Sequence, residues 1–512
     1  MLLALALCSG CATSTAPDEV DLLIAGGTVY TGSAAPFFGD VAVKGDRIFA
    51  VGQRLRVRAV RTIDARGMIV VPGFIDPHTH AGEQLASGDP EERLIRQFLM
   101  QGVTTAFIGN DGAGDLDVAK VLGSAETKPV GINYAAYVGF GAVRKLAMGE
   151  ANRAPTAGEL ERMKRLVAGA MCEGALGLST GLFYAPQSFA GTGEVVALAR
   201  EAAGRGGIYD SHIRDESSYT VGLSAAVDEA LAIGREARIP VNISHIKALG
   251  VDVQGQAPAI IARIEAAQRT GQKVTADQYP WSASGTTLTS ALMPLWAQDG
   301  GRREMLKRLD NPQLAARLRT EMAENLRKRG GAESLLLVAG AHKGRRLSEL
   351  AHGDAVGAAI DLIRVSDQPV ASFNQIEPDI AGFMRRPWVL TGSDASGGHP
   401  RAFGSFARKY SQYVVADRVI TLRQFIEQSS SRTAETFGLT DRGRLRAGAF
   451  ADIVVFDPRS YAALATYEEP TRLAAGVQTV VVNGTLAVDG GALTGKAAGR
   501  ALRRQPPPGS CP

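Results

Sequence analysis

The central part of the chain alternates short apolar segments with longer helix-like stretches, and this alternation constrains the fold more than any other feature. Helix-like stretches at 157–172, 194–204, 219–237 and 257–270 separate several of the apolar segments. Eight segments have the length and composition of buried strands: FIDPHTH, TTAFIGND, GINYAAYVG, ALGLSTG, GIYDSHI, VNISHIK, KVTADQY and WVLTGSD. Eight strands with helices between them are typical of a (β/α)8 TIM barrel. The sequence therefore predicts an α/β fold with such a barrel over residues 73–439.

Segments with a different residue pattern flank this region. Short strands with Gly-Asp and Ala-Arg-Gly turns are expected in residues 21–72, and residues 443–488 show the same pattern of short strands and turns. We expect residues 19–72 and 440–492 to pair into one small β-sandwich. Residues 288–375 exceed the length of one connection, which predicts an insertion between strands seven and eight with helices and a strand near 334–338. The proline-rich tail, residues 493–512, is expected to be disordered.

Charge and cysteine content exclude several classes of protein. The 56 Lys and Arg residues against 52 Asp and Glu residues give a net charge of +4, which is too balanced for a nucleic-acid or membrane-surface protein. Four cysteines are too few for a disulfide scaffold. Because Cys172 lies in a helix-like stretch and Cys511 in the expected frayed tail, we expect no bridge between them.

The first residues, MLLALALCSGC, are too few to span a membrane, which takes about 18 apolar residues. They resemble the end of a bacterial lipoprotein signal, in which Cys11 is the lipidated residue. No Lys or Arg precedes the apolar run, and Cys8 stands where an aliphatic residue is usual. We expect residues 1–18 to be a leader and tether of an exported periplasmic or outer-membrane lipoprotein. The alternative is an ordinary disordered terminus on a cytoplasmic protein.

Histidines collect at the ends of the expected strands, where barrel active sites lie. His78 and His80 form an H-x-H pair whose side chains share one face of a strand. His212 and His245 end the fifth and sixth strands, and Asp394 ends the eighth. A lone histidine is more often structural than a metal ligand, but four on one rim with a carboxylate indicate a zinc-like metal site.

These residues lie within motifs that resemble the amidohydrolase superfamily, and within it the N-acyl-D-amino-acid deacylase (D-aminoacylase) family. H-x-H alone is a weak signal, but H-x-H, SHIRDE, SHIK and GSD in this order with GLSTGL are highly specific. The resemblance covers residues 20–490 and rests on GGTVYTG, VPGFIDPHTH, QGVTTAFIGND, GALGLSTGLFYAP, SHIRDE, ISHIKALG, DQYPWSASGTTL, PWVLTGSDASGGHPRAFGSFAR and GRLRAGAFADIVVFDP.

The resemblance implies a centre of one or two divalent ions. It assigns His78 and His80 to one metal site, His212 and His245 to the other, and the role of ligand and catalytic acid/base to Asp394. Asp111 stands where the family has a cysteine ligand. Asp111 is either a bridging carboxylate ligand or only a turn residue. As a ligand, a carboxylate is harder than a thiolate and favours manganese or cobalt beside zinc. Phe140 stands where related chains often carry a histidine, so part of the usual pocket differs here.

The implied activity is metal-dependent hydrolysis of N-acyl-D-amino acids to a carboxylate and a free D-amino acid. The binding partner is thus a small molecule, and its free carboxylate needs cationic or hydroxyl side chains to bind it, which we call the clamp. Lys247 and Arg401 are the candidates on the rim, with Tyr279 and Ser284 added by the resemblance. The alternative for the two cations is a solvated surface position.

Two other functions stay open at the sequence level. The first is a related hydrolase of cyclic amides or dipeptides, similar to dihydroorotase or hydantoinase. Such relatives usually carry a carboxylated lysine on strand four, and ALGLSTG contains no lysine. The second is a non-catalytic ligand-binding lipoprotein. The retained Asp394 argues against this second function.

Overall fold

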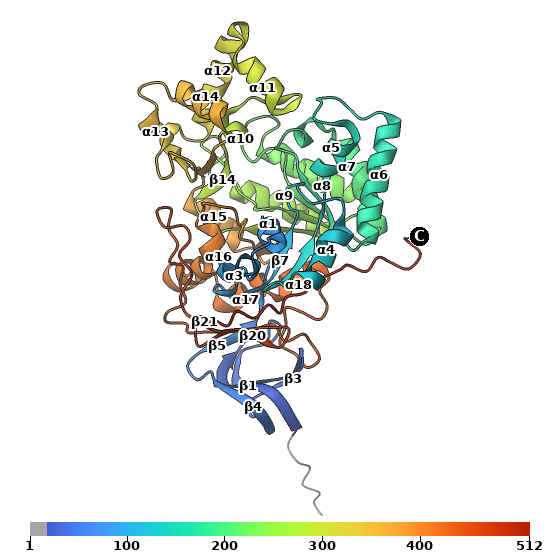
Figure 1. Ribbon diagram of the computed structural model, residues 1–512, viewed down its shortest axis with the longest axis vertical. Coiled ribbons are helices and arrows are strands. Elements are labelled where there is room, and N and C mark those ends of the chain that lie inside the picture. The colour runs from blue at the N-terminus through green and yellow to red at the C-terminus, as the bar shows by residue number, and fades with distance from the viewer. Residues whose placement is uncertain (1–17, 512) are drawn as a thin grey trace, which may run out of the picture.

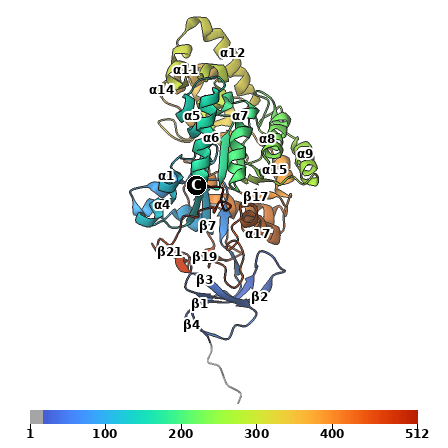
Figure 2. The same ribbon diagram turned by 90° about the vertical axis from the view of Figure 1, so that its right-hand side faces the viewer.

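The computed structural model describes residues 18–511, so the expected lipidation residue Cys11 lies outside the described part of the chain. The molecule is elongated, with strands β1–β4 at one end, the barrel in the middle and helices α11, α12 and α14 at the other end (Figure 1, Figure 2). Within residues 18–511 no helix has the length and apolar character needed to cross a membrane.

Parallel strands form the barrel, and every one of them overlaps a segment expected from the sequence. They are β6 (Phe74–Asp76), β7 (Val103–Ile108), β8 (Asn133–Ala136) with its continuation β9 (Val138–Gly139), β10 (Gly177–Gly181), β11 (Ile208–His212), β12 (Val241–Ile243), β13 (Val274–Gln278) and β17 (Val389–Thr391). The ring closes beyond β6 and β17, where Thr79 bridges Ala395 and the Asp394 amide donates to the His78 carbonyl at 2.9 Å. The predicted (β/α)8 barrel is confirmed.

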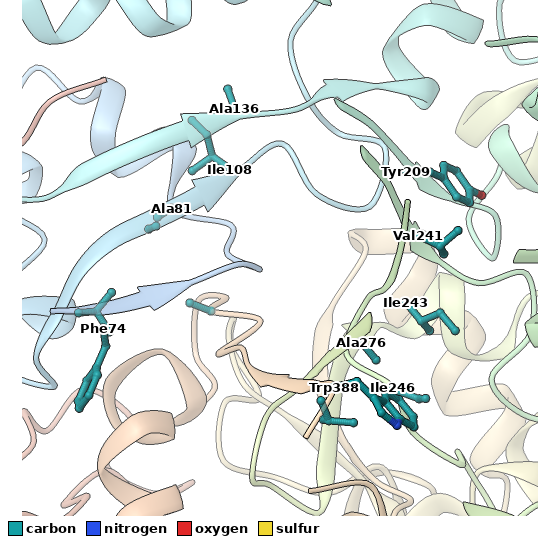
Figure 3. Close-up of a cluster of buried hydrophobic side chains, with 14 of the residues drawn as sticks. Phe74, Ala81, Ile108, Ala136, Tyr209, Val241, Ile243, Ile246, Ala276 and Trp388 are labelled. Atoms are coloured by element: carbon teal, nitrogen blue, oxygen red, sulfur yellow. The ribbon is translucent and has the colours of Figure 1, made fainter. Parts of the chain in front are cut away.

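Helices on the outside of the barrel connect its strands. In α8 the buried residues Leu223, Val227, Ala230 and Leu231 follow helical spacing and form one apolar face. Figure 3 shows part of the resulting core, which includes Phe74 of β6. The connecting helices are α1 (Gly82–Ala86), α2 (Pro90–Arg93), α3 (Arg96–Leu99), α4 (Val118–Thr127), α5 (Phe140–Met148), α6 (Ala157–Cys172), α7 (Thr192–Gly204), α8 (Leu223–Ala237), α9 (Ala257–Arg269), α15 (Glu377–Met384), α16 (Arg401–Arg408), α17 (Leu422–Ser429) and α18 (Ser431–Phe437).

A nine-stranded sheet combines strands from both ends of the sequence. Its order is β21-β20-β19-β18-β5-β1-β2-β3, and β4 pairs with β1. Within the sheet, the antiparallel pairing of β5 with β18 joins the strands of the two ends. Its strands are β1 (Asp18–Val29), β2 (Phe37–Lys44), β3 (Arg47–Gly52), β4 (Val57–Asp64), β5 (Ile69–Pro72), β18 (Ile453–Phe456), β19 (Val477–Val482), β20 (Thr485–Asp489) and β21 (Ala492–Leu493).

The long segment between β13 and β17 folds around a core of its own. A three-stranded antiparallel sheet, in the order β14-β16-β15, supports the helices of this segment. Its elements are β14 (Ala283–Thr287), α10 (Leu288–Leu292), α11 (Gly301–Leu309), α12 (Pro312–Lys328), β15 (Leu335–Leu337), α13 (Leu347–Leu350), α14 (Ala355–Val365) and β16 (Pro369–Phe373). We call residues 283–373 the insertion.

The C-terminal tail differs from its prediction as a disordered segment. Its backbone pairs with the start of β8, where the Leu502 amide donates to the Tyr134 carbonyl at 2.7 Å and the Tyr134 amide donates to the Arg500 carbonyl at 3.0 Å. A disulfide joins Cys172, the last residue of α6, to Cys511, so the expectation of no bridge was wrong. Backbone hydrogen bonds, the disulfide, arginine side chains such as Arg503 and the packing of Leu502 against the core together hold the tail.

Candidate metal centre and active site

All six metal ligands expected from the sequence meet at the carboxyl ends of the barrel strands. Two overlapping groups place their ligand atoms within 4.8 Å of one another, and Asp111 belongs to both. The first group is His78, His80, Asp111 and Asp394, and the second is Asp111, His212 and His245. Because the strands are parallel, residues far apart in the sequence end at the same rim.

Asp111 occupies the middle of this cluster. Its Oδ1 lies 3.4 Å from His78 Nε2, 3.5 Å from His245 Nε2 and 3.8 Å from His212 Nδ1. Its Oδ2 lies 3.5 Å from His80 Nε2. One carboxylate between two histidine pairs is the arrangement that a bridging ligand requires.

The donor atoms fit divalent cations. Both ring nitrogens of His78, Asp111 Oδ1 and His212 Nε2 are buried without a hydrogen-bond partner among the described residues. Such atoms are costly to bury unless something binds them. Burial, the largest influence, lowers the pKa of His212 to about 4, so its ring is neutral at pH 7, as metal binding requires. Burial also lowers the pKa of His78, but Asp111, Asp277 and Asp394 outweigh burial and raise it to about 10, so the site favours bound positive charge.

Three of the ligand candidates have unusual backbone conformations. The φ angles of Asp111, His245 and Asp394 are 57°, 35° and 48°, in the left-handed region that non-glycine residues rarely adopt. Strained residues of this kind cluster at functional sites, where the surrounding structure holds them in place. The three residues lie just beyond the ends of β7, β12 and β17, and each belongs to one or both of the ligand groups.

Sequence reasoning missed three buried carboxylates beneath the ligands, Asp76, Asp210 and Asp277. Asp277 Oδ1 accepts the His245 amide at 2.9 Å, and Asp210 accepts the side chains of Asn110 and Asn242 at 3.0 and 2.8 Å. Burial raises the pKa of Asp76 to about 7 and that of Asp210 to about 6. The available signal was the repeat Asp-x-His in DPH and DSH, because residues two apart share one face of a strand.

Glu216 is a further residue that sequence reasoning did not assign. Its Oε1 lies 3.1 Å from His245 Nδ1 and accepts from Lys247 Nζ at 2.5 Å. A carboxylate beside Nδ1 orients a histidine so that Nε2 faces a metal, an arrangement common around metal-bound histidines. In this structure His245 Nε2 lies 2.9 Å from His212 Nδ1, and Lys247 Nζ lies 2.8 Å from His245 Nδ1. Lys247, expected as a substrate clamp, therefore has a protein carboxylate as its partner in the cavity.

Arg401, the second expected clamp, lies against Asp394. Its Nη1 is 2.6 Å from Asp394 Oδ2, and its Nη2 donates to Ser396 Oγ at 3.0 Å. Burial raises the pKa of Asp394, but Arg401 and the neighbouring histidines outweigh burial and hold it well below the usual range. Asp394 is therefore ionised at neutral pH, and its Oδ1 lies 3.1 Å from His80 Nε2.

The cluster opens into a cavity of about 730 Å³ between the barrel rim and the insertion. Tyr279 and Ser284, the other expected substrate contacts, line this cavity together with Lys247 and Arg401. Tyr279 lies close to both cations, with its ring centroid 5.6 Å from Lys247 Nζ and 5.0 Å from Arg401 Cζ. Phe140 is buried in the barrel core and does not line the cavity.

Comparison with known proteins places the chain in a family. Residues 297–488 match the model of the Amidohydrolase family. D-aminoacylase from Alcaligenes xylosoxydans xylosoxydans is 35% identical, over 94% of this chain and 98% of the relative. A solved D-aminoacylase with a binuclear metal centre has a TM-score of 0.82 and 31% identity, over 95% of this chain and 100% of that chain.

A second solved structure carries a ligand. N-acyl-D-glutamate deacylase from Bordetella Bronchiseptica, in complex with zinc and a phosphonate that mimics the tetrahedral intermediate, has a TM-score of 0.80 and 31% identity, over 95% of this chain and 100% of that chain. Two solved structures at TM-scores of 0.82 and 0.80 over 95% of this chain agree with the observed fold. The protein belongs to the N-acyl-D-amino-acid deacylase (D-aminoacylase) family of metal-dependent amidohydrolases.

Proposed function

We propose that this enzyme hydrolyses the amide bond of N-acyl-D-amino acids and releases a carboxylate and a free D-amino acid. The observation that carries the proposal is the set of four histidines and two aspartates, all but His78 lining a cavity that also holds Lys247 and Arg401. A small molecule with one amide and one free carboxylate matches this site, because the metal ligands are suited to the amide and the two cations to the carboxylate. D-aminoacylase and N-acyl-D-glutamate deacylase, two of its relatives, support the choice of substrate.

We assign His78, His80, His212, His245, Asp111 and Asp394 to bind one or two divalent ions, with zinc as the first choice. Such an ion lowers the pKa of water and polarises the substrate carbonyl. Asp111 replaces a thiolate with a harder oxygen ligand, so manganese and cobalt belong in the same test.

Asp394 is the proposed acid and base. Its ionised carboxylate accepts a proton from the attacking water and then delivers that proton to the leaving amine nitrogen. Arg401 fixes the orientation of this carboxylate through the 2.6 Å contact of Nη1 with Oδ2. Tyr279, Ser284, Lys247 and Arg401 surround the part of the cavity where the substrate carboxylate is proposed to bind.

The test is hydrolysis of paired N-acetyl-D- and N-acetyl-L-amino acids by the metal-loaded enzyme. We expect turnover of the D series and little of the L series. Turnover of hydantoins, dihydroorotate or dipeptides in place of both series would contradict the proposal.

We also propose that the protein is exported and anchored through Cys11. The apolar run before Cys11 supports this, and the Cys172–Cys511 disulfide supports an oxidising compartment such as the periplasm. Cys11→Ser should abolish incorporation of a labelled fatty acid and release the protein from the membrane fraction. Equal labelling of both forms, or recovery of the unaltered protein in the cytoplasm, would refute the anchor.

A further inference from the structure

The turn that carries Asp111 has an unusual backbone conformation. Gly109, Asp111 and Gly112 all have positive φ, at 82°, 57° and 72°. Asp111 Oδ1 has no hydrogen-bond partner among residues 18–511, so no neighbouring donor sets its direction. A bridging carboxylate must present its two oxygens to two ion positions, and a rotation of the main chain at Asp111 would move an oxygen away from one of them. The metal centre therefore depends on the contacts that fix this backbone.

Ser179 of β10 holds the turn on both sides of Asp111. Its Oγ donates to the Gly109 carbonyl at 2.5 Å and accepts the Gly112 amide at 3.1 Å. The Ser179 side chain is buried, and both of these hydrogen bonds go to the main chain of the turn. This serine belongs to the GLSTG segment, and the turn gives it a role other than that of a nucleophile.

Gln187 ties the main chain of Asp111 to the end of β10. It begins the short helix Gln187–Phe189, is 7% exposed and lines the same cavity as the metal ligands. Its Nε2 donates to the Asp111 carbonyl at 2.9 Å, and its Oε1 accepts the Gly181 amide at 2.8 Å. Because a main-chain carbonyl only accepts and a main-chain amide only donates, the two partners fix the orientation of the Gln187 side chain.

Glycines make the space in which Gln187 and the turn pack against each other. A Cβ atom at Gly112 would lie 2.0 Å from Gln187 Oε1, and one at Gly141 would lie 2.9 Å from Gln187 Nε2. A Cβ atom at Gly181 would lie 2.4 Å from the Asp111 carbonyl oxygen. A larger residue at any of these three positions would push the side-chain amide and the carbonyl apart.

We infer that Gln187, together with Ser179, is a positioning residue that sets the affinity of the centre for its second ion, the one assigned to His78 and His80. Gln187 acts through the main chain of Asp111. Without the Gln187 amide, the Asp111 carbonyl loses its hydrogen-bond donor and the turn can relax until the carboxylate reaches only one pair of histidines. The inference rests on the proposed metal-dependent function and adds to it a residue with no role so far.

The experiment measures the number and affinity of bound zinc ions by calorimetric titration of the metal-free protein, with no substrate present. Gln187→Met keeps the length of the side chain but removes both hydrogen bonds, and Ser179→Ala removes the hydroxyl. Gln428→Met is the matched control, because Gln428 is also buried and donates to two main-chain carbonyls but does not line the cavity. Thermal unfolding of each variant checks that it is folded.

Loss of an outer contact to a metal ligand typically costs about tenfold to hundredfold in metal affinity. We expect Gln187→Met to bind the second ion more weakly by that factor and to bind the first ion, at His212 and His245, within about threefold of the wild type. Ser179→Ala should weaken the same second ion. Gln428→Met should leave both affinities within about threefold, even where its unfolding temperature falls as far as that of Gln187→Met.

A double variant tests whether Gln187 acts through Asp111. The combination of Asp111→Asn with Gln187→Met should bind zinc as Asp111→Asn alone does, because residues that act as one unit do not have additive effects. A further loss of affinity in the double variant, or a second ion that Gln187→Met binds as tightly as the wild type, would overturn the inference.

Failure of the proposed function would look different. A wild type that binds two ions but hydrolyses no N-acyl-D-amino acid would refute the proposed function and leave the comparison of zinc affinities valid. A wild type that binds fewer than two ions would overturn the inference, even where it hydrolyses N-acyl-D-amino acids.

Discussion

Asp111 contacts all four histidines of the proposed metal centre at 3.4–3.8 Å through one or other carboxylate oxygen. A thiolate has one donor atom, whereas this carboxylate has two and directs them at different histidines. At the residue scale, the identity of position 111 therefore decides how the two metal positions are joined. The main-chain φ of 57° at Asp111 also matters, because asparagine tolerates this region better than most residues.

Asp111→Asn removes the negative charge with little change of backbone preference, so its effect reports on metal binding. We expect bound zinc, counted by atomic emission, to fall from about two ions per chain to about one. Asp111→Cys, which supplies a thiolate, should retain the ion held by His212 and His245. A count that stays the same in Asp111→Asn would mean that Asp111 is only a turn residue.

Asp394→Asn keeps the size of the side chain but removes the base. General acid–base catalysis typically contributes 10²–10⁴-fold, so kcat on the best N-acetyl-D-amino acid should fall by about that factor. Asp394 belongs to the ligand group of His78 and His80 and not to that of His212 and His245, so an ion at the latter pair should remain bound, which atomic emission checks. Activity within about threefold of the wild type would exclude Asp394 as the acid and base.

At the scale of elements, the barrel could be predicted because its signal is local. Each strand is a short apolar segment, and the ligands stand at strand ends, as in His78 after β6 and His212 at the end of β11. Asp76 and Asp210 were overlooked because a carboxylate inside an apolar strand is visible in sequence only through its spacing to the histidine. Gln187 was overlooked because its contact with Asp111 depends on how the segment after β10 folds.

The C-terminal tail shows which features local sequence patterns do not predict. Composition predicts disorder, but composition does not reveal which backbone groups of β8 are free to pair with Arg500 and Leu502. The same holds for the disulfide, whose two cysteines are separated by 339 residues. Long-range partners of this kind are set by the completed fold and not by the local pattern.

The disulfide should stabilise the folded protein by constraining the unfolded chain. Cys172→Ser should lower the free energy of unfolding by about 2–4 kcal/mol, measured by urea denaturation. Cys511→Ser is the matched control and should give the same loss, with no further loss in the double variant. Reductant should destabilise only the wild type, and a wild type that is insensitive to reductant would contradict the bridge.

At the scale of the whole molecule, the active site lies between two units with separate cores. The barrel supplies the metal ligands and Asp394, whereas the insertion supplies Ser284 and Arg329 to the same cavity. The nine-stranded sheet lies at the opposite end of the barrel and contributes no residue to the cavity lining (Figure 1).

The most direct test of metal-dependent deacylation is to chelate the protein and then restore zinc, manganese or cobalt while bound metal and hydrolysis of N-acetyl-D-amino acids are measured on the same samples. The account predicts an inactive metal-free protein and activity that returns in proportion to the first ion bound. Full activity without metal, or no binding of any of the three ions, would contradict it.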